Sequence, residues 1–144
     1  LALHLSGSIK SVSAYGFIED KMIDYASVFL THNNGNFSRI QASRITEKRA
    51  RSIQATCVDM YVDCDLLRKE IIINRQTKNF QKRNEPYVIN SFEETVEIRP
   101  QEALLTELQA FVLSCLGDPV DKPDAQDGLE AMRICDEIQK KILQ

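Results

Sequence analysis

The order of two hydrophobic periodicities along the chain limits its fold more than any other feature. Residues 9–75 contain short runs in which apolar and polar residues alternate, whereas residues 101–142 repeat apolar residues at every third or fourth position. The first pattern is typical of strands and the second of helices. Because the strand-like runs follow one another through short connections, the strands must be largely antiparallel. Strands followed by helices predict an α+β domain rather than a doubly wound parallel sheet.

The strand prediction is clearest around one turn. Asn33-Asn34-Gly35-Asn36 separates the strand-like runs 23–32 and 37–45, and Asn-Gly in this setting is a strong hairpin signal. Within the run 23–32, Ala26, Val28 and Leu30 alternate with aromatic and hydroxyl side chains, so its two faces differ. Further strands are expected at 9–17, 51–58, 60–66, 69–75 and 87–99, with a polar, mobile loop at 76–86. The sequence therefore predicts an open, mostly antiparallel sheet of six or seven strands.

Two amphipathic helices are expected after Pro100. The first has an apolar face made of Leu104, Leu108, Phe111, Val112 and Cys115 and is ended by Gly117. Asp124 is expected to cap the second, whose apolar face comprises Leu129, Met132, Cys135, Ile138 and Ile142. Both helices are expected to pack on one face of the sheet, with Cys115 and Cys135 as buried free thiols. The helix-free face must then be solvated or buried against a partner.

The first seven residues have a different character. Residues 1–7 (LALHLSG) are typical of the last turns of a helix that ends at a glycine, and residue 1 is Leu rather than Met. A helix this short has no cap and is not expected to be stable alone. We therefore interpret residues 1–7 as the end of a truncated linking helix and residues 8–144 as one domain of a longer protein. A short expression tail or a product of proteolysis is the alternative origin.

Composition excludes several classes of protein. The 144 residues include 18 Lys and Arg against 21 Asp and Glu, a net charge of −3, which disfavours general binding to nucleic acids or acidic membranes. Apolar runs are short, as in Ile71-Ile72-Ile73, so no membrane-spanning segment is predicted. Four cysteines in a chain without a secretory signal favour a reducing compartment, and a cytoplasmic protein is expected.

Most catalytic and cofactor motifs are missing from the sequence. The five glycines form neither G-x-G-x-x-G nor a Walker A spacing, so this chain is not expected to bind a dinucleotide or a triphosphate. The cysteine spacings do not match a zinc site. Only His4 and His32 could activate a catalytic thiol, and neither is placed to do so, so no catalytic residue is expected.

The acidic residues allow two interpretations. They are close together in sequence at Asp59, Asp63, Asp65, Glu93 and Glu94. Such a group can hold a cation, but acidic side chains that discourage pairing at an exposed strand edge explain them better. No metal site is predicted.

One cationic cluster is the best candidate for ligand binding. Arg44, Lys48, Arg49 and Arg51 lie around a turn between two strands, and only Glu47 offsets their charge. Arginine can bind phosphate or carboxylate through two parallel hydrogen bonds. The alternative is a solvated turn rich in long side chains. No aromatic residues are interleaved with the basic ones, which argues against nucleic acid.

Several segments, taken in order, resemble a known family. They are "HLSG", "SIKSVSAYGF", "DYASVFLTHNNGNFSRIQASR", "KRARSIQATC", "YVDCDLLRKEIII", "EALLTELQAFVLSCLG" and "DAQDGLEAMRICDEIQKKI". Together they resemble the C-terminal domain of the Gfo/Idh/MocA family of NAD(P)-dependent oxidoreductases over almost the whole chain. The "ASR…K…R" turn and the strand after it are similar to those of nucleotide-sugar 3-dehydrogenases, such as enzymes acting on UDP-N-acetylglucosamine.

The resemblance implies a parent enzyme that oxidises a sugar or nucleotide-sugar hydroxyl with NAD or NADP. An N-terminal Rossmann domain, absent here, would carry the cofactor fingerprint and the catalytic Lys and His. This chain would bind substrate through Ser43, Arg44, Lys48 and Arg49, with the cations facing a phosphate or uronate. Its helix-free sheet face would form a homodimer or tetramer. Alone it would be inactive. The alternative is an autonomous β-sheet dimerisation or binding module without enzymatic activity.

Overall fold

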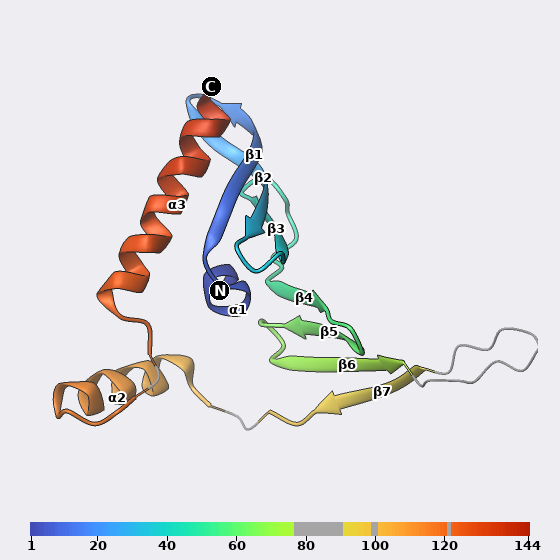
Figure 1. The fold of residues 1–144 in the computed structure, drawn as a ribbon, viewed down its shortest axis with the longest axis vertical. Helices are drawn as coiled ribbons and strands as arrows, with labels where there is room; N and C mark the ends of the chain where they lie inside the picture. The colour runs from blue at the N-terminus through green and yellow to red at the C-terminus, as the bar shows by residue number, and fades with distance from the viewer. Residues whose placement is uncertain (77–90, 99–100, 121) are drawn as a thin grey trace, which may run out of the picture. The chain divides into compact units, whose positions relative to one another are not determined.

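The computed structural model describes residues 1–76, 91–98, 101–120 and 122–144. The elements run in the order α1 (Ala2–Ser6), β1 (Ile9–Glu19), β2 (Met22–His32), β3 (Phe37–Ser43), β4 (Ser52–Thr56), β5 (Met60–Asp65), β6 (Glu70–Gln76), β7 (Ser91–Val96), α2 (Ala103–Cys115) and α3 (Ala125–Leu143) (Figure 1). They form two compact units: unit 1 contains Leu1–Glu47 and Leu108–Gln144, and unit 2 contains Lys48–Glu107.

Unit 1 is built on a three-stranded antiparallel sheet in the order β1-β2-β3 (Figure 1). Asp20 and Lys21, both with positive φ, form the two-residue turn between β1 and β2. The predicted hairpin turn joins β2 to β3, and Gly35 has a φ of 87° there, which glycine adopts at little cost. The backbone N–H of His32 donates to the carbonyl of Asn36 at 2.8 Å and closes this turn.

The core of unit 1 lies between this sheet and α3. Val12, Ala14, Val28 and Leu30 are buried, and Ile138 and Ile142 of α3 pack against them. Because Val12 pairs with Leu30 and Ala14 with Val28, all four buried residues share one face of the sheet. The alternation predicted for the run 23–32 is confirmed.

One glycine allows α3 to approach the sheet closely. A Cβ atom at Gly16 would lie 2.6 Å from Cγ2 of Ile142 and 2.9 Å from the carbonyl oxygen of Tyr25. Real Cβ atoms do not approach other heavy atoms so closely, so any side chain here would push α3 away. Gly16 therefore fixes which part of α3 meets β1.

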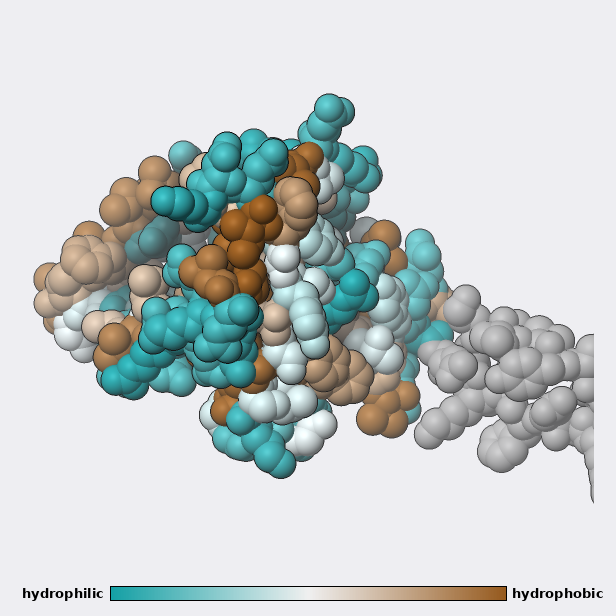
Figure 2. Space-filling model, turned by 90° about the horizontal axis from the view of Figure 1, so that it is seen from above, coloured by the Kyte–Doolittle hydropathy of each residue, from teal (hydrophilic) through white to brown (hydrophobic). Residues whose placement is uncertain are grey.

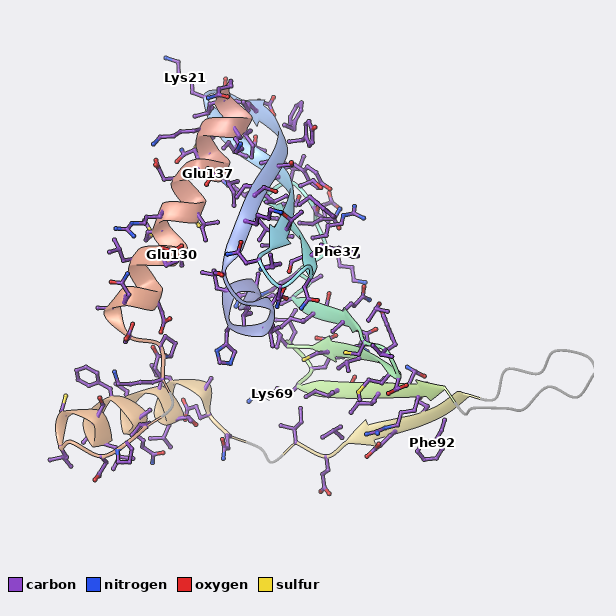
Figure 3. All side chains as sticks on the ribbon, in the orientation of Figure 1. Lys21, Phe37, Lys69, Phe92, Glu130 and Glu137 are labelled. Atoms are coloured by element: carbon purple, nitrogen blue, oxygen red, sulfur yellow. The ribbon has the colours of Figure 1, made fainter. Side chains whose placement is uncertain are left out.

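The capping prediction for α3 is confirmed, but only part of its predicted apolar face is. The Asp124 side chain accepts from the N–H of Asp127, and the Asp127 side chain accepts from the N–H of Asp124, which forms a capping box. Ile138 and Ile142 pack on the core, as expected. Leu129 (46% exposed), Met132 (68% exposed) and Cys135 do not, and the half-buried Ile134 lies instead in line with Ile138 and Ile142. Figure 3 labels Glu130 and Glu137 on the same helix.

Unit 2 contains a four-stranded antiparallel sheet in the order β4-β5-β6-β7. Its register separates the side chains into two faces. One is largely apolar and contains the ion pair of Arg75 with Glu94 beside Ile53, Ala55, Met60, Val62, Cys64, Ile71, Ile73, Phe92 and Val96. The other carries mostly polar and acidic residues. No side chain of unit 2 is fully buried in the ranges that the structure describes. Most residues of the apolar face are half-buried, and Phe92 is 61% exposed.

The helix α2 carries its apolar residues at the surface (Figure 2). Leu104, Leu108, Phe111 and Val112 are all more than 50% exposed, and Cys115 is exposed too. Gly117, with a φ of 90°, follows the end of the helix, as predicted. The expectation that Cys115 and Cys135 are buried was wrong: both thiols are free but exposed, because neither side chain lies on a helix face that packs on the sheet.

The predicted fold class is confirmed: the chain is α+β, and its pairings are antiparallel. Its seven described strands are divided between two sheets rather than joined in one, because no hydrogen bonds pair β3 with β4. Within the described ranges, no helix has both the length and the apolar character needed to cross a bilayer. The predicted loop 76–86 lies almost entirely outside the described residues, as does the start of the last strand before Ser91.

Candidate functional site

Two of the four candidate substrate-binding residues lie at the end of β3. Ser43 is the last residue of that strand, and the backbone N–H of Arg44 donates to the carbonyl of Asp24 at 2.8 Å. One guanidinium nitrogen of Arg44 lies 3.5 Å from the sulfur of Met22. The backbone of Arg44 is therefore bonded to β2 of the β1-β2-β3 sheet, which we call sheet 1, while its side chain stays exposed.

The Ser43 side chain organises the turn that follows. Its Oγ accepts from the backbone N–H of Thr46 at 3.1 Å and from the Thr46 hydroxyl at 2.6 Å. Such bonds from a serine to a residue three positions later favour a turn over continued strand. β3 therefore ends at Ser43, two residues before the strand end predicted from the sequence.

The other two candidates, Lys48 and Arg49, belong to unit 2. The structure thus brings together Ser43 and Arg44 but divides the four predicted residues between the units. Lys48 acts electrostatically on Asp65. The backbone N–H of Arg68 is the main cause of a lowered pKa at Asp65, and the positive charges of Arg68 and Lys48 lower that pKa further.

The basic residues of the predicted cluster are divided between the units, with Arg44 in unit 1 and Lys48, Arg49 and Arg51 in unit 2. Arg44, Lys48, Arg49 and Arg51 are exposed, and none forms an ion pair within 4 Å with a carboxylate in the described parts of the chain. A guanidinium without a carboxylate partner can still form two parallel hydrogen bonds to a phosphate or carboxylate. Its chemistry suits an anionic ligand better than a neutral one.

The acidic residues agree only in part with the strand-edge prediction: Glu93 and Glu94 lie on β7, at an edge of the four-stranded sheet. Asp63 and Asp65 share a face of β5, but β5 lies between β4 and β6, so it is not the exposed strand edge expected from the sequence. Asp65 accepts from the N–H groups of Leu67 and Arg68 at 2.9 and 3.0 Å, so it stabilises the β5–β6 turn. Within the described ranges, no three potential metal ligands form a group that could hold an ion.

The helix-free face of sheet 1 carries a group of aromatic side chains that the sequence analysis did not single out. We call it the aromatic face, and it comprises Tyr15, Phe17, Tyr25, Phe29 and Phe37. Four of these residues are 44–78% exposed, and the Phe29 and Phe37 rings stack with centroids 5.6 Å apart. Figure 3 shows Phe37 on the side of β3 away from α3. Alternation in the run 23–32 already indicated this face, but not its full extent across three strands.

His32 is the second residue whose environment sequence reasoning missed. It was considered only as a base for a thiol, yet it is 2% exposed and lies at the end of β2. Its Nδ1 lies 2.8 Å from the carbonyl oxygen of Gly7, and its Nε2 lies 2.8 Å from the Ser38 hydroxyl. Both ring nitrogens are thus occupied, which makes His32 unsuitable as a free catalytic base.

Unit 1 thus combines an antiparallel sheet with α3 on one face, the aromatic face opposite and the exposed Arg44 after β3. No protein-family model matches the sequence, and no curated protein matches it either. Solved structures do share its fold. UDP-N-acetylglucosamine 3-dehydrogenase GnnA from Acidithiobacillus ferrooxidans, in one crystal form, superposes with a TM-score of 0.82 at 23% identity, over 97% of this chain and 44% of the enzyme.

A second crystal form of the same enzyme gives a TM-score of 0.79, also at 23% identity, over 97% of this chain and 42% of the enzyme. Biliverdin reductase from Synechocystis sp. PCC 6803, solved with biliverdin and NADP+, gives 0.55 at 13% identity, over 99% of this chain and 43% of the reductase. GnnA is a Gfo/Idh/MocA family enzyme, so the resemblance noted in the sequence is confirmed at the level of the fold. The chain spans less than half the length of these structural neighbours.

Proposed function

We propose that residues 8–144 form the C-terminal substrate-binding and oligomerisation domain of an NAD(P)-dependent oxidoreductase that acts on a sugar or nucleotide-sugar hydroxyl. The observation that carries this proposal is the superposition of 97% of the chain on 44% of a nucleotide-sugar dehydrogenase. The remaining part of the parent protein would be an N-terminal Rossmann domain. Residues 1–7 would be the end of the helix that links the two domains, and the chain alone would be inactive.

The cofactor, NAD or NADP, would be bound by that other domain, because this chain's residues do not fit a dinucleotide. A dinucleotide cradle needs a glycine-rich turn that leads from a strand into a helix. Here Gly7 leads from α1 into β1, Gly16 lies inside β1, and Gly35 lies in a hairpin. Gly117 follows α2, and Gly128 lies inside α3. The chemistry of hydride transfer would thus be supplied outside these residues, and this domain would shape the substrate pocket.

Substrate binding is assigned to Ser43, Arg44, Lys48 and Arg49. The support is chemical: exposed cations around one turn suit a diphosphate or a uronate carboxylate. A nucleotide sugar carries a diphosphate, so this proposal agrees with the substrate named for the structural neighbour. The role of Ser43 would be to hold the turn, through Thr46, in the shape that presents Arg44.

Oligomerisation is assigned to the aromatic face. Exposed aromatic groups of this extent are uncommon on monomers and typical of interfaces. A homodimer or tetramer formed through this face would bury Tyr15, Phe17, Phe29 and Phe37, which are 44–78% exposed. Light scattering should show a dimer or tetramer. Phe37→Ser should lower the assembly state, whereas Val58→Ser, at a fully exposed residue of unit 2, should not.

A cytoplasmic location is part of the proposal. The four cysteines are free, and Cys57, Cys115 and Cys135 are exposed, which suits a reducing compartment. A second candidate function, an autonomous dimerisation module without enzymatic activity, is favoured by the aromatic face alone. The two candidates differ in what precedes the chain, because only the first needs a glycine-rich βαβ unit upstream of Leu1.

The decisive test is turnover by the full-length protein. It should be assayed with NAD and NADP against a panel of nucleotide sugars, uronates and polyols, with absorbance of the reduced cofactor as the readout. The proposal predicts oxidation of at least one nucleotide sugar or sugar. No turnover with any member of the panel, combined with stable oligomers, would instead support the dimerisation module.

The substrate-binding residues have a test of their own. Arg44→Ala and Arg49→Ala should each raise the substrate KM about tenfold or more, because a charge-assisted hydrogen bond contributes roughly 1.5–3 kcal/mol. Arg133→Ala is the matched control, since Arg133 is an exposed arginine of α3 paired with Glu130 at 3.6 Å. An unchanged KM in both arginine variants would remove these residues from the pocket.

A further inference from the structure

The junction between α1 and β1 is held by an unusual number of polar contacts. α1 has only five residues, and its N-cap residue, Leu1, makes no capping bond through its side chain. Gly7 follows with φ 80° and ψ −168°, a conformation that disfavours other residues. A helix of this length is not stable in water without further contacts. Something other than its own backbone bonds must therefore hold α1 in place.

The hairpin between β2 and β3 supplies those contacts. Three consecutive carbonyl groups at the junction accept hydrogen bonds from three consecutive hairpin residues. The Asn34 Nδ2 donates to Ser6 at 2.9 Å, the His32 ring donates to Gly7 at 2.8 Å, and the Asn33 backbone N–H donates to Ser8 at 3.0 Å. Asn33 Nδ2 also donates to the Ser8 hydroxyl at 2.8 Å. We call Ser6–Ser8 with these three hairpin residues the junction clamp.

His32 is the buried centre of the junction clamp. Because a carbonyl oxygen only accepts, Nδ1 must carry the proton that meets Gly7. In the neutral ring, Nε2 then accepts from the Ser38 hydroxyl, whose oxygen lies 3.4 Å from that of Ser6. At 2% exposure the ring has no access to water that could replace either bond. Its two nitrogens thus join the end of α1 to β3.

Apolar packing reinforces the polar contacts on both sides of the junction. Ala2 of α1 and Ile9 of β1 pack against the buried core that contains Leu30. α1 also contacts β3. Apolar and polar contacts therefore both join α1 and the junction to the β2–β3 hairpin.

We propose that His32 is a positioning residue: it locks α1 onto sheet 1 and so fixes the direction in which the polypeptide enters this domain at Leu1. In a parent enzyme of the kind described above, on which the functional half of this inference rests, the clamp would set the orientation of the cofactor-binding domain relative to the substrate pocket. Loss of the clamp would then reduce turnover without weakening cofactor binding.

The first experiment measures the lock directly by amide hydrogen exchange in the full-length protein. The reporters are the amides of Leu5 and Gly7, which donate to Leu1 and Leu3 within α1. His32→Ala should speed their exchange about tenfold or more, since a buried hydrogen bond and its packing are lost. His32→Gln, which keeps one donor, should give a smaller increase.

A second variant guards against misfolding of the buried site. Asn34 is exposed, and its Oδ1 accepts from the N–H of Asn36 at 3.0 Å, while its Nδ2 holds Ser6. Asn34→Asp keeps the first bond and removes the second, so the hairpin should form while α1 exchanges faster. Ser11→Ala is the control. It removes the 2.6 Å hydrogen bond between the hydroxyls of Ser11 in β1 and Thr31 in β2, which lies outside the junction clamp.

The same variants then test positioning in the full-length protein. His32→Ala should lower kcat about tenfold, and Asn34→Asp should lower it about threefold. The KM for the cofactor should stay within about twofold. Unchanged exchange of α1 in both variants would overturn the lock, and faster exchange with an unchanged kcat would overturn the positioning role. If the unmodified protein oxidises no sugar, the proposed enzymatic function fails, and the exchange data alone decide whether the lock exists.

Discussion

The two units are built from the same kind of antiparallel sheet but differ in how that sheet is covered. In unit 1, α3 covers one face, and Val12, Ala14, Val28 and Leu30 are buried under it. In unit 2, most residues of the apolar face around Val62 are half-buried, and none is fully buried in the described ranges. Sheets of similar size can therefore have very different shares of the buried core. A helix that packs on the sheet, rather than strand pairing alone, supplies the burial.

The largest expected effect is the difference in stability lost when one apolar side chain is truncated in each unit. Leu30→Ala in unit 1 should cost about 3 kcal/mol of unfolding free energy, because Leu30 is 1% exposed and leaves a cavity. Ile73→Ala on the apolar face of unit 2 should cost about 1 kcal/mol, because that residue is only half-buried. Urea unfolding followed by amide resonances from each unit measures both. Equal losses would show that the unit 2 face is as fully covered as the core of unit 1.

The next effect tests the contact that gives unit 1 its core. Gly16→Ala should destabilise unit 1 by about 2 kcal/mol, because the new Cβ would lie 2.6 Å from Cγ2 of Ile142. Gly128→Ala within α3 is the matched control. No heavy atom lies within 4 Å of its Cβ position, so alanine should stabilise the helix by about 0.5–1 kcal/mol. If Gly16→Ala were neutral, α3 would not pack closely on β1.

A third prediction concerns pH and should not distinguish the units. The Asp127 N–H holds the pKa of Asp124 below its ordinary value, and the Arg68 N–H does the same for Asp65. Each lowered pKa stabilises the fold above the ordinary value of about 3.9, and the contribution is lost as pH falls through the lower folded pKa. Carboxyl NMR titration should give both pKa values below 3.9.

The matching variants test the cause of that acid sensitivity. Asp124→Asn and Asp65→Asn should each remove the local change on acidification, at the start of α3 and in the β5–β6 turn respectively. A persistent local change in either variant would assign it to other groups. If both variants abolish the local change on acidification, the two units differ in their cores but not in the acid sensitivity of these turns.

The smallest effect compares two strained turn residues, both labelled in Figure 3. Lys21 in unit 1 and Lys69 in unit 2 have positive φ values of 66° and 58°. Lys21→Gly should stabilise the protein by about 0.5 kcal/mol, since relief of strain exceeds the added freedom of the unfolded chain. Lys69→Gly should gain less, because Lys69 Nζ also donates to the carbonyl of Gln101 at 2.7 Å. Thermal unfolding of the two variants side by side measures the difference.

Much of the fold could be predicted because strand alternation and turn chemistry are local. Asn33–Asn36 predicted the hairpin, and alternation placed Val28 and Leu30 on the face that is buried. The packed face of α3 was harder to predict, since apolar residues lie on more than one side of this helix. Periodicity placed Leu129, Met132 and Cys135 on one face with Ile138 and Ile142, but only the last two pack on the core. The close approach of Ile142 to Gly16 joins residues far apart in sequence, so no local pattern indicates it.

The candidate site was predictable only in part, for the same reason. Charge and spacing grouped Arg44 with Lys48 and Arg49 around one turn, but did not indicate that Lys48 begins a second unit. The contacts of His32 with Gly7 span 25 residues, so no local pattern indicates them. The aromatic face was visible in β2 alone, and its extension to Tyr15 and Phe37 depends on the strand register.

The central claim is that these residues shape a substrate site and an assembly surface while another domain binds the nicotinamide cofactor. Titration of NADH and NADPH by fluorescence, into residues 1–144 and into the full-length protein side by side, tests it most directly. The account predicts saturable binding of at least one cofactor to the full-length protein and none to residues 1–144. Saturable binding to residues 1–144, or its absence from the full-length protein, would contradict it.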